Sequence, residues 1–193
     1  MLVVSRYSNR YPNVTVKLDL TDRFVDLVEE RIDVAIRIGE LSDSSLVARN
    51  LGEVSMHLCA STEYLAEHGE PVEPAQLADH RCVLDSNYPG GNHWKLGRQK
   101  ESVSIEVKPR LIVNSARAGR ELVRSGQGIA FLPSFAIADD INKGRIQRLL
   151  HQYASEPIGI YAVYQHRKHL SAKIRLFIEE MNEYFNSNAP LAL

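Results

Sequence analysis

Short polar residues stand at two points where an apolar run gives way to a helical pattern. Thr21 follows the alternating run at residues 14–20, and Asn114 and Ser115 follow the apolar run at residues 111–113. Such residues cap helix N-termini, where the first backbone N–H groups lack intrahelical partners and the dipole favours negative charge. At each point we therefore expect either a plain N-cap or a contact with an anionic ligand such as a carboxylate.

A pair of glycines completes the second of these patterns. Gly126 and Gly128 follow the helical segment that begins after Ser115, and a second apolar run follows at residues 129–132. The order is strand, capped helix, glycine turn, strand, which places a helix start at the carboxyl end of a strand. Ligands bind at that edge in open α/β sheets, so we count Gly128 among the candidate ligand-binding residues.

Five further residues are candidates for ligand contact. Ile38, Gly39 and Glu40 end the strand predicted at residues 32–38. Gly39 would allow close backbone approach, whereas the Glu40 carboxylate would disfavour an anion and pair with a cation. Trp94, the single tryptophan, is either a core aromatic or a ligand contact, and Phe135 either walls the ligand site or packs behind it.

Residue patterns typical of catalysis are not found in this sequence. It has no GxSxG, HExxH or Walker motif. His166 and His169 are spaced i, i+3 but have no cysteine nearby, which is a weak pattern for a metal site. We therefore predict no catalytic residues, no metal and no cofactor, and we do not expect an enzyme.

Composition excludes several classes of protein. Lys and Arg total 23 and Asp and Glu total 24 in 193 residues, so the basic excess of a nucleic-acid-binding surface is missing. No apolar run approaches the roughly 20 residues that span a bilayer, and no leader sequence stands at the start. Cys59 and Cys82 lie singly in apolar runs, which predicts buried, reduced thiols in a cytoplasmic protein without a membrane partner.

Hydrophobic periodicity predicts an α/β fold. The first 40 residues read as a helix at 2–10, a strand at 14–20, a helix after Thr21 and a strand at 32–38. This alternation predicts parallel strands joined by right-handed crossovers. Further strands are predicted at 46–51, 55–60, 81–84, 93–96, 103–107, 146–150 and 158–164, and further helices at 61–66, 74–77, 134–141 and 171–185.

The whole chain resembles the effector-binding domain of LysR-type transcriptional regulators. The segments that carry the resemblance occur in the family's order along the chain. They are RYPNV at residues 10–14, LTDRFVDLVEE at 20–30, DVAIRIG at 33–39, SSLVAR at 44–49, CASTEYL at 59–65, GQGIAFLP at 126–133 and YAVY at 161–164 with the final helix.

The resemblance implies two Rossmann-like subdomains of the type 2 periplasmic-binding-protein kind. Two hinge-crossing strands would join residues 1–57 plus 162–193 to residues 58–161. A small-molecule effector would bind in the cleft between them, where the family positions that match Asn114 and Ser115 lie, and would alter the geometry of a homodimer or higher homo-oligomer. The alternative is a solute-binding protein of the same fold without a role at DNA.

Parts of a complete regulator have no counterpart in this sequence. These are the N-terminal helix-turn-helix, the linker helix and a first strand, so we expect DNA binding only through the missing helix-turn-helix. Three explanations remain open: a fragment, a misassigned start codon, or a partner that supplies the strand.

Overall fold

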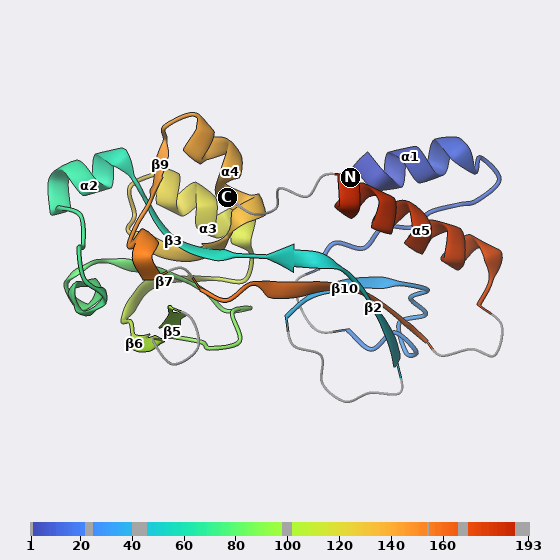
Figure 1. Cartoon of the computed structure of the whole chain (residues 1–193), viewed down its shortest axis with the longest axis horizontal. Coiled ribbons are helices and arrows are strands. Elements are labelled where there is room, and N and C mark those ends of the chain that lie inside the picture. The colour runs from blue at the N-terminus through green and yellow to red at the C-terminus, as the bar shows by residue number, and fades with distance from the viewer. Residues whose placement is uncertain are drawn as a thin grey trace. The chain divides into compact units, whose positions relative to one another are not determined.

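The computed structural model describes residues 2–21, 25–39, 46–97, 102–153, 155–165 and 170–187. The chain forms two compact units (Figure 1). The first unit comprises Met1–Glu53 and Ile158–Pro190, and the second comprises Val54–Pro157. The chain therefore passes between the units twice, after Glu53 and after Pro157.

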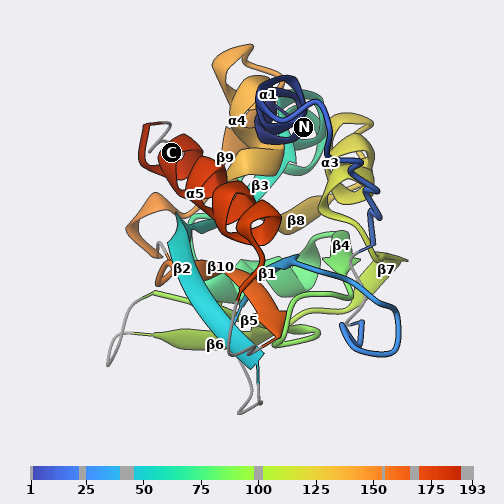
Figure 2. The same ribbon diagram turned by 90° about the vertical axis from the view of Figure 1, so that its right-hand side faces the viewer.

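The first unit contains a three-stranded sheet in the order β1-β10-β2. The strands are β1 (Ala35–Ile38), β2 (Leu46–Val54) and β10 (Ile158–Gln165). Helices α1 (Leu2–Arg10) and α5 (Ala172–Ser187) lie on the same side of this sheet (Figure 1, Figure 2). The helices meet through Tyr7, whose hydroxyl donates to the Lys173 carbonyl oxygen (2.8 Å) and whose ring lies edge-on to Phe177.

Two predictions for the first unit are wrong. Residues 14–20 belong to no strand, although Val14 and Val16 are half-buried as the alternating pattern predicts. The pattern reports which side chains face the protein, but a strand also needs a neighbour for its backbone hydrogen bonds. The predicted parallel crossover is also not formed, because β1 pairs antiparallel with β10, from the other end of the chain.

The helix predicted after Thr21 is a hydrogen-bonded turn in the part that the structure describes. Residues 22–24 lie outside the described residues, and residues 27–31 form the turn. The Asp26 carboxylate caps it by accepting from the backbone N–H groups of Val28 (2.7 Å) and Glu29 (3.1 Å). Arg31 ends it with a φ of 54°, a left-handed conformation that does not continue a helix.

The second unit is built on a five-stranded sheet in the order β7-β4-β8-β3-β9. Strand β4 is parallel to both β7 and β8, and β3 is antiparallel to both β8 and β9. Every residue of β3, β4 and β8 is buried. The strands are β3 (Met56–Ser61), β4 (Cys82–Asp85), β7 (Pro109–Val113), β8 (Ile129–Pro133) and β9 (Ile146–Arg148).

The second unit also contains the helices predicted at residues 61–66, 74–77, 134–141 and after Ser115. Helix α2 (Thr62–His68) begins at Ser61, whose Oγ accepts from the Tyr64 N–H (3.2 Å), as expected of a cap. Helices α3 (Ala116–Arg124) and α4 (Ser134–Asn142) contribute Val123 and Ile137 to the core around Leu132. The other elements are the 3₁₀ helices η1 (Pro74–Asp79) and η3 (His151–Tyr153) and the predicted antiparallel pair β5 (His93–Leu96) and β6 (Val103–Glu106).

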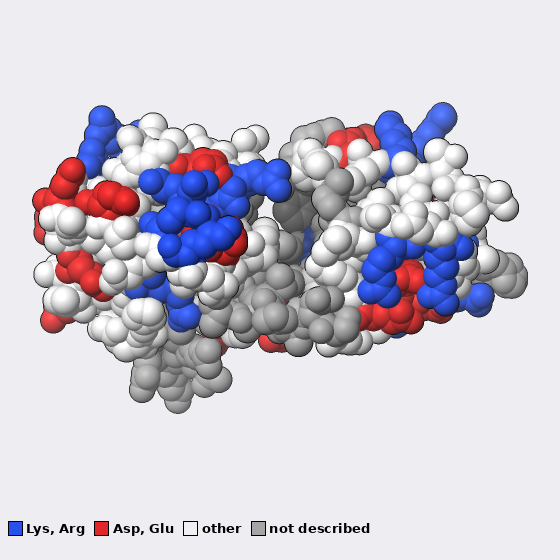
Figure 3. All heavy atoms as spheres, turned by 90° about the horizontal axis from the view of Figure 1, so that it is seen from above, with Lys and Arg blue, Asp and Glu red and all other residues white. Residues whose placement is uncertain are grey.

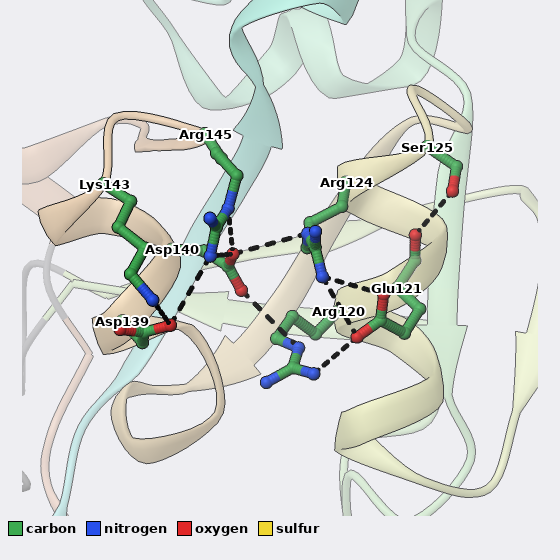
Figure 4. A network of polar contacts seen from close by, with 8 residues as sticks. All are labelled: Arg120, Glu121, Arg124, Ser125, Asp139, Asp140, Lys143 and Arg145. Carbon is green, nitrogen blue, oxygen red and sulfur yellow. Dashed lines mark hydrogen bonds and ion pairs between the residues drawn. The ribbon is translucent and has the colours of Figure 1, made fainter.

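One buried carboxylate holds α3 and α4 together (Figure 4). The Asp140 side chain is 2% exposed and forms ion pairs with Arg120 and Arg124 of α3 and with Arg145 beyond α4. Figure 3 shows basic side chains gathered on one face of this unit with acidic atoms beside them. These arginines are therefore partly neutralised by the protein itself.

Both cysteines are buried as predicted. Cys59 and Cys82 are each 0% exposed and unbridged. Burial raises the pKa of each thiol to about 12, so neither forms a thiolate near neutral pH. In the described part of the chain, no helix has the length and apolar composition needed to span a membrane.

Candidate functional site

Three parallel strands of the second unit end at one edge of its sheet. In the order β7-β4-β8, they end at Val113, Asp85 and Pro133. Helix α3 starts just beyond β7 and helix α4 starts directly after β8. The structure therefore confirms the strand-to-helix junction predicted at Asn114 and places a second junction beside it.

Polar contacts join the ends of β4 and β7. The Asp85 carboxylate accepts from the backbone N–H (3.0 Å) and side-chain amide (3.1 Å) of Asn87. The same amide donates to the Asn114 carbonyl oxygen (2.7 Å), while the Ser86 N–H donates to the Val113 carbonyl oxygen (2.7 Å). Asn114 is exposed, so these bonds fix its backbone and leave its side chain at the surface.

Ser115 occupies the N-cap position of α3 with an extended backbone, φ −154° and ψ 126°. Its side chain makes no capping hydrogen bond. The first turn of α3 carries no acidic residue, and Arg117 in that turn is exposed. Ser115 therefore occupies the position of a plain N-cap, but its hydroxyl does not make the hydrogen bond that such a cap makes. The start of α3 suits an anion.

Ser134 at the start of α4 is a polar residue that the sequence analysis missed. It is 1% exposed, and its N–H donates to the Ser55 carbonyl oxygen (2.9 Å). Within the described chain its Oγ has no hydrogen-bond partner. A buried hydroxyl without a partner is unfavourable, so Ser134 is a further candidate at this edge. The signal was available, because a serine directly after an apolar run repeats the pattern at Asn114 and Ser115.

Gly128 lies at the opposite edge of the sheet from Asn114, because it precedes the amino end of β8. Its φ is 146°, and a Cβ there would lie 2.2 Å from the Arg81 carbonyl oxygen. The Ile129 N–H donates to that same oxygen (2.8 Å). A side chain at position 128 would therefore collide with the backbone at Arg81, which explains why a glycine is needed there. The structure does not bring Gly128 together with Asn114.

The two aromatic candidates differ in exposure. Trp94 is 1% exposed and packs with its ring centroid 6.0 Å from that of Phe131, which favours the core alternative. Phe135 is 45% exposed in the first turn of α4, next to Ser134.

The candidates of the first unit lie at the end of β1 and at Thr21. Ile38 is 43% exposed, and Gly39 follows with a φ of 127° and an N–H that donates to the Gly159 carbonyl oxygen (3.1 Å). Thr21 is exposed, and Glu40 lies outside the described residues. A ligand site shared by the two units stays a prediction.

The described residues contain no group of three His, Cys, Asp or Glu side chains that could hold a metal ion. His166 and His169, the weak pair noted in the sequence, lie outside those residues.

Comparison with known proteins identifies the family. The model of the LysR substrate binding domain matches residues 1–186. The transcriptional activator AaeR of Escherichia coli is 31% identical over 183 residues, which cover 95% of this chain and 59% of AaeR. The regulator CrgA of Neisseria meningitidis is 32% identical over 188 residues, which cover 96% of this chain and 62% of CrgA.

Solved structures of such regulators have the same fold. The regulatory domain of Neisseria meningitidis CrgA superposes with a TM-score of 0.85 at 30% identity, over 95% of this chain and 90% of that one. A full-length variant of AphB gives 0.82 at 29% identity, over 95% of this chain and 62% of AphB.

The fold is an α/β fold of the two-subdomain, periplasmic-binding-protein kind. The chain belongs to the LysR substrate binding domain family, whose members are transcriptional regulators and not enzymes. It spans about three fifths of the length of the curated relatives it matches. These relatives do not favour the alternative of a transport-type solute-binding protein.

Proposed function

We propose that this domain binds a small-molecule effector and passes the binding signal to DNA through a LysR-type regulator. The observation that carries the proposal is the carboxyl edge of β7, β4 and β8, where two helices start beside Asn114, Ser115 and Ser134. An edge of this kind is where open α/β sheets bind ligands. Because the chain belongs to a family of transcriptional regulators, we infer that such a ligand acts as an effector.

The chemistry at this edge favours a ligand with a carboxylate or another anionic group. Neither α3 nor α4 has an acidic residue in its first turn, and the Asp85 carboxylate at the same edge is already bound by the N–H and amide groups of Asn87. The hydroxyls of Ser115 and Ser134 add donors that the helices themselves do not use. Thr21, Ile38 and Gly39 are the candidate contacts that the first unit would contribute.

Thermal-shift screening of small metabolic carboxylates against the domain tests this proposal. Asn114→Ala and Ser115→Ala are each expected to weaken the affinity of a stabilising compound about ten-fold, as loss of a hydrogen bond to a charged group does. Ser104→Ala on the exposed face of β6 is the control and should bind normally. Binding that is unchanged in both site variants would refute the assignment to this edge.

Transmission to DNA requires an oligomer, and we propose a homodimer or higher homo-oligomer. The partners of the whole regulator would be its effector, further copies of the chain, and DNA through a helix-turn-helix, in the cytoplasm. We take Val28, which is 62% exposed in the turn that follows Thr21, as the candidate interface residue.

Sedimentation of the domain and of two matched variants tests the interface. Val28→Asp is expected to shift the distribution toward the monomer, because a carboxylate would be buried in the interface. Val72→Asp, at a 65% exposed valine in the second unit, should leave it unchanged. A wild-type domain that stays monomeric at high concentration would contradict the proposal.

A further inference from the structure

The second unit contains a small hollow that none of the candidate effector residues line. It lies where β3 begins and where the chain leaves β9, and its polar lining residues are His57, Arg148, His151 and Tyr153. The centre of a water-sized molecule can occupy about 10 Å³ of this hollow, so the hollow suits only a small occupant.

Two residues that line this hollow each have a buried nitrogen atom without a hydrogen-bond partner among the described residues. His57 is 7% exposed, and its Nε2 is buried and unpaired. The Nε of Arg148 is also buried and unpaired. Leaving a buried donor unsatisfied costs on the order of 1–3 kcal/mol, more for a charged group, so two together at one hollow indicate an acceptor that occupies it.

The charge of the lining favours an anionic acceptor. None of the ten lining residues is Asp or Glu, whereas Arg148 carries a permanent positive charge. Desolvation, and then the charges of Arg148 and His151, lower the pKa of His57 to about 4. A second positive charge is therefore strongly disfavoured here. An anion would balance Arg148, whereas a water molecule would satisfy the donors but leave the charge uncompensated.

We propose that this hollow binds a small inorganic anion of chloride size, held by His57 Nε2–H and Arg148 Nε–H. The site is independent of the effector proposal, because it shares no residue with the edge at Asn114. It makes the stability of the second unit depend on the anion present.

Histidine NMR of the isotope-labelled domain tests the site in solution. Chloride is exchanged for gluconate at constant ionic strength while the protonation of each ring is followed. Chloride is expected to raise the pKa of His57, because an adjacent anion stabilises the imidazolium, and to leave the ring resonances of the exposed His93 in place. The ring should be the Nε2–H tautomer. An Nδ1–H tautomer, or a His57 pKa indifferent to chloride, would overturn the proposal.

Variants of Arg148 show how much of the chloride affinity comes from its hydrogen bond and how much from its positive charge. Arg148→Gln is expected to weaken chloride binding at least about ten-fold, and Arg148→Lys to restore part of it because Lys keeps the positive charge without the Nε–H fork. Arg110→Gln, at an exposed position of β7, should behave as wild type. Circular dichroism confirms that each variant is folded. Equal chloride affinity in Arg148→Gln and Arg110→Gln would count against the site.

Crystals soaked in bromide give an independent readout. An anomalous peak within hydrogen-bond distance of both His57 Nε2 and Arg148 Nε is the expected result. Density for water without an anomalous signal would show that the hollow holds only solvent, and the proposal would fail.

Discussion

Each unit joins a pair of helices through one buried carboxylate, but the two pairs are assembled differently. In the second unit Asp140 is 2% exposed and meets three arginines, all between residues 120 and 145. In the first unit Glu180 is 4% exposed and meets Arg6 and Arg10, and the hydrogen bond to Arg10 spans 170 residues.

The difference extends to the sheets that these helices cover. Strands β3, β4 and β8 of the second unit are buried throughout, whereas β1 of the first unit alternates between half-buried and exposed residues. The second unit therefore combines local contacts with a sheet whose three central strands are fully buried. The first unit depends on contacts between the two ends of the chain, so its stability should be the more sensitive to what happens at those ends.

The largest expected effect comes from a glycine of the second unit, and a glycine of the first unit serves as its comparison. Gly128→Ala would place a Cβ 2.2 Å from the Arg81 carbonyl oxygen, and we expect it to destabilise the second unit by about 3 kcal/mol or more. Gly39→Ala has nothing within 4 Å of its Cβ, so only the strain of its φ of 127° remains, about 1–2 kcal/mol. Urea unfolding followed by the fluorescence of Trp94 reports the second unit, and far-ultraviolet circular dichroism reports both.

Equal losses in the two glycine variants would show that the close approach at Arg81 relaxes. The difference between the units would then lie in their helix pairs alone.

A smaller effect is expected from the two carboxylates. Asp140→Asn leaves three arginines close together without their shared counter-charge, and we expect a loss of about 2–3 kcal/mol. Glu180→Gln should cost about 1–2 kcal/mol, since it removes the shared partner of only two arginines, both more than half exposed. The same urea unfolding experiments measure both. A larger loss of unfolding free energy for Glu180→Gln than for Asp140→Asn would show that the carboxylate of the first unit contributes more to stability.

A further difference between the units is a dependence on pH that His57 gives to the second unit. The pKa of His57 is lowered to about 4 from 6.5, first by desolvation. Between these values the unfolded chain binds the proton and the folded chain does not, so stability rises with pH in this window. The contribution of His57 is complete above pH 6.5 and is lost as the pH falls toward 4.

Comparison with His57→Gln isolates this contribution from that of other acids and bases. The difference in Trp94-detected stability between wild type and variant should shrink as the pH falls from 6.5 to 4. A difference that stays constant across that range would show that His57 is not held neutral by the fold.

Local patterns were sufficient for most of the second unit. The runs that became β4 and β8 are continuous and apolar because both faces of those strands are covered. The helix predicted at residues 61–66 forms with Ser61 as its cap, and the strand, helix, glycine turn and strand around Asn114 and Gly128 form as predicted. In each case the relevant contacts lie within a few residues of one another, where spacing alone carries the information.

What the sequence by itself determined is therefore the family, the elements of the second unit and the polar junction at Asn114 and Ser115. Only the tertiary structure decided that β10 is the antiparallel partner of β1 and that residues 14–20 remain outside the sheet. It also decided that Ser134 and His57 have buried polar atoms without a partner among the residues that the structure describes. The reason is physical: strand partners and the satisfaction of buried polar atoms depend on residues distant in sequence, and periodicity carries no information about which of these will meet.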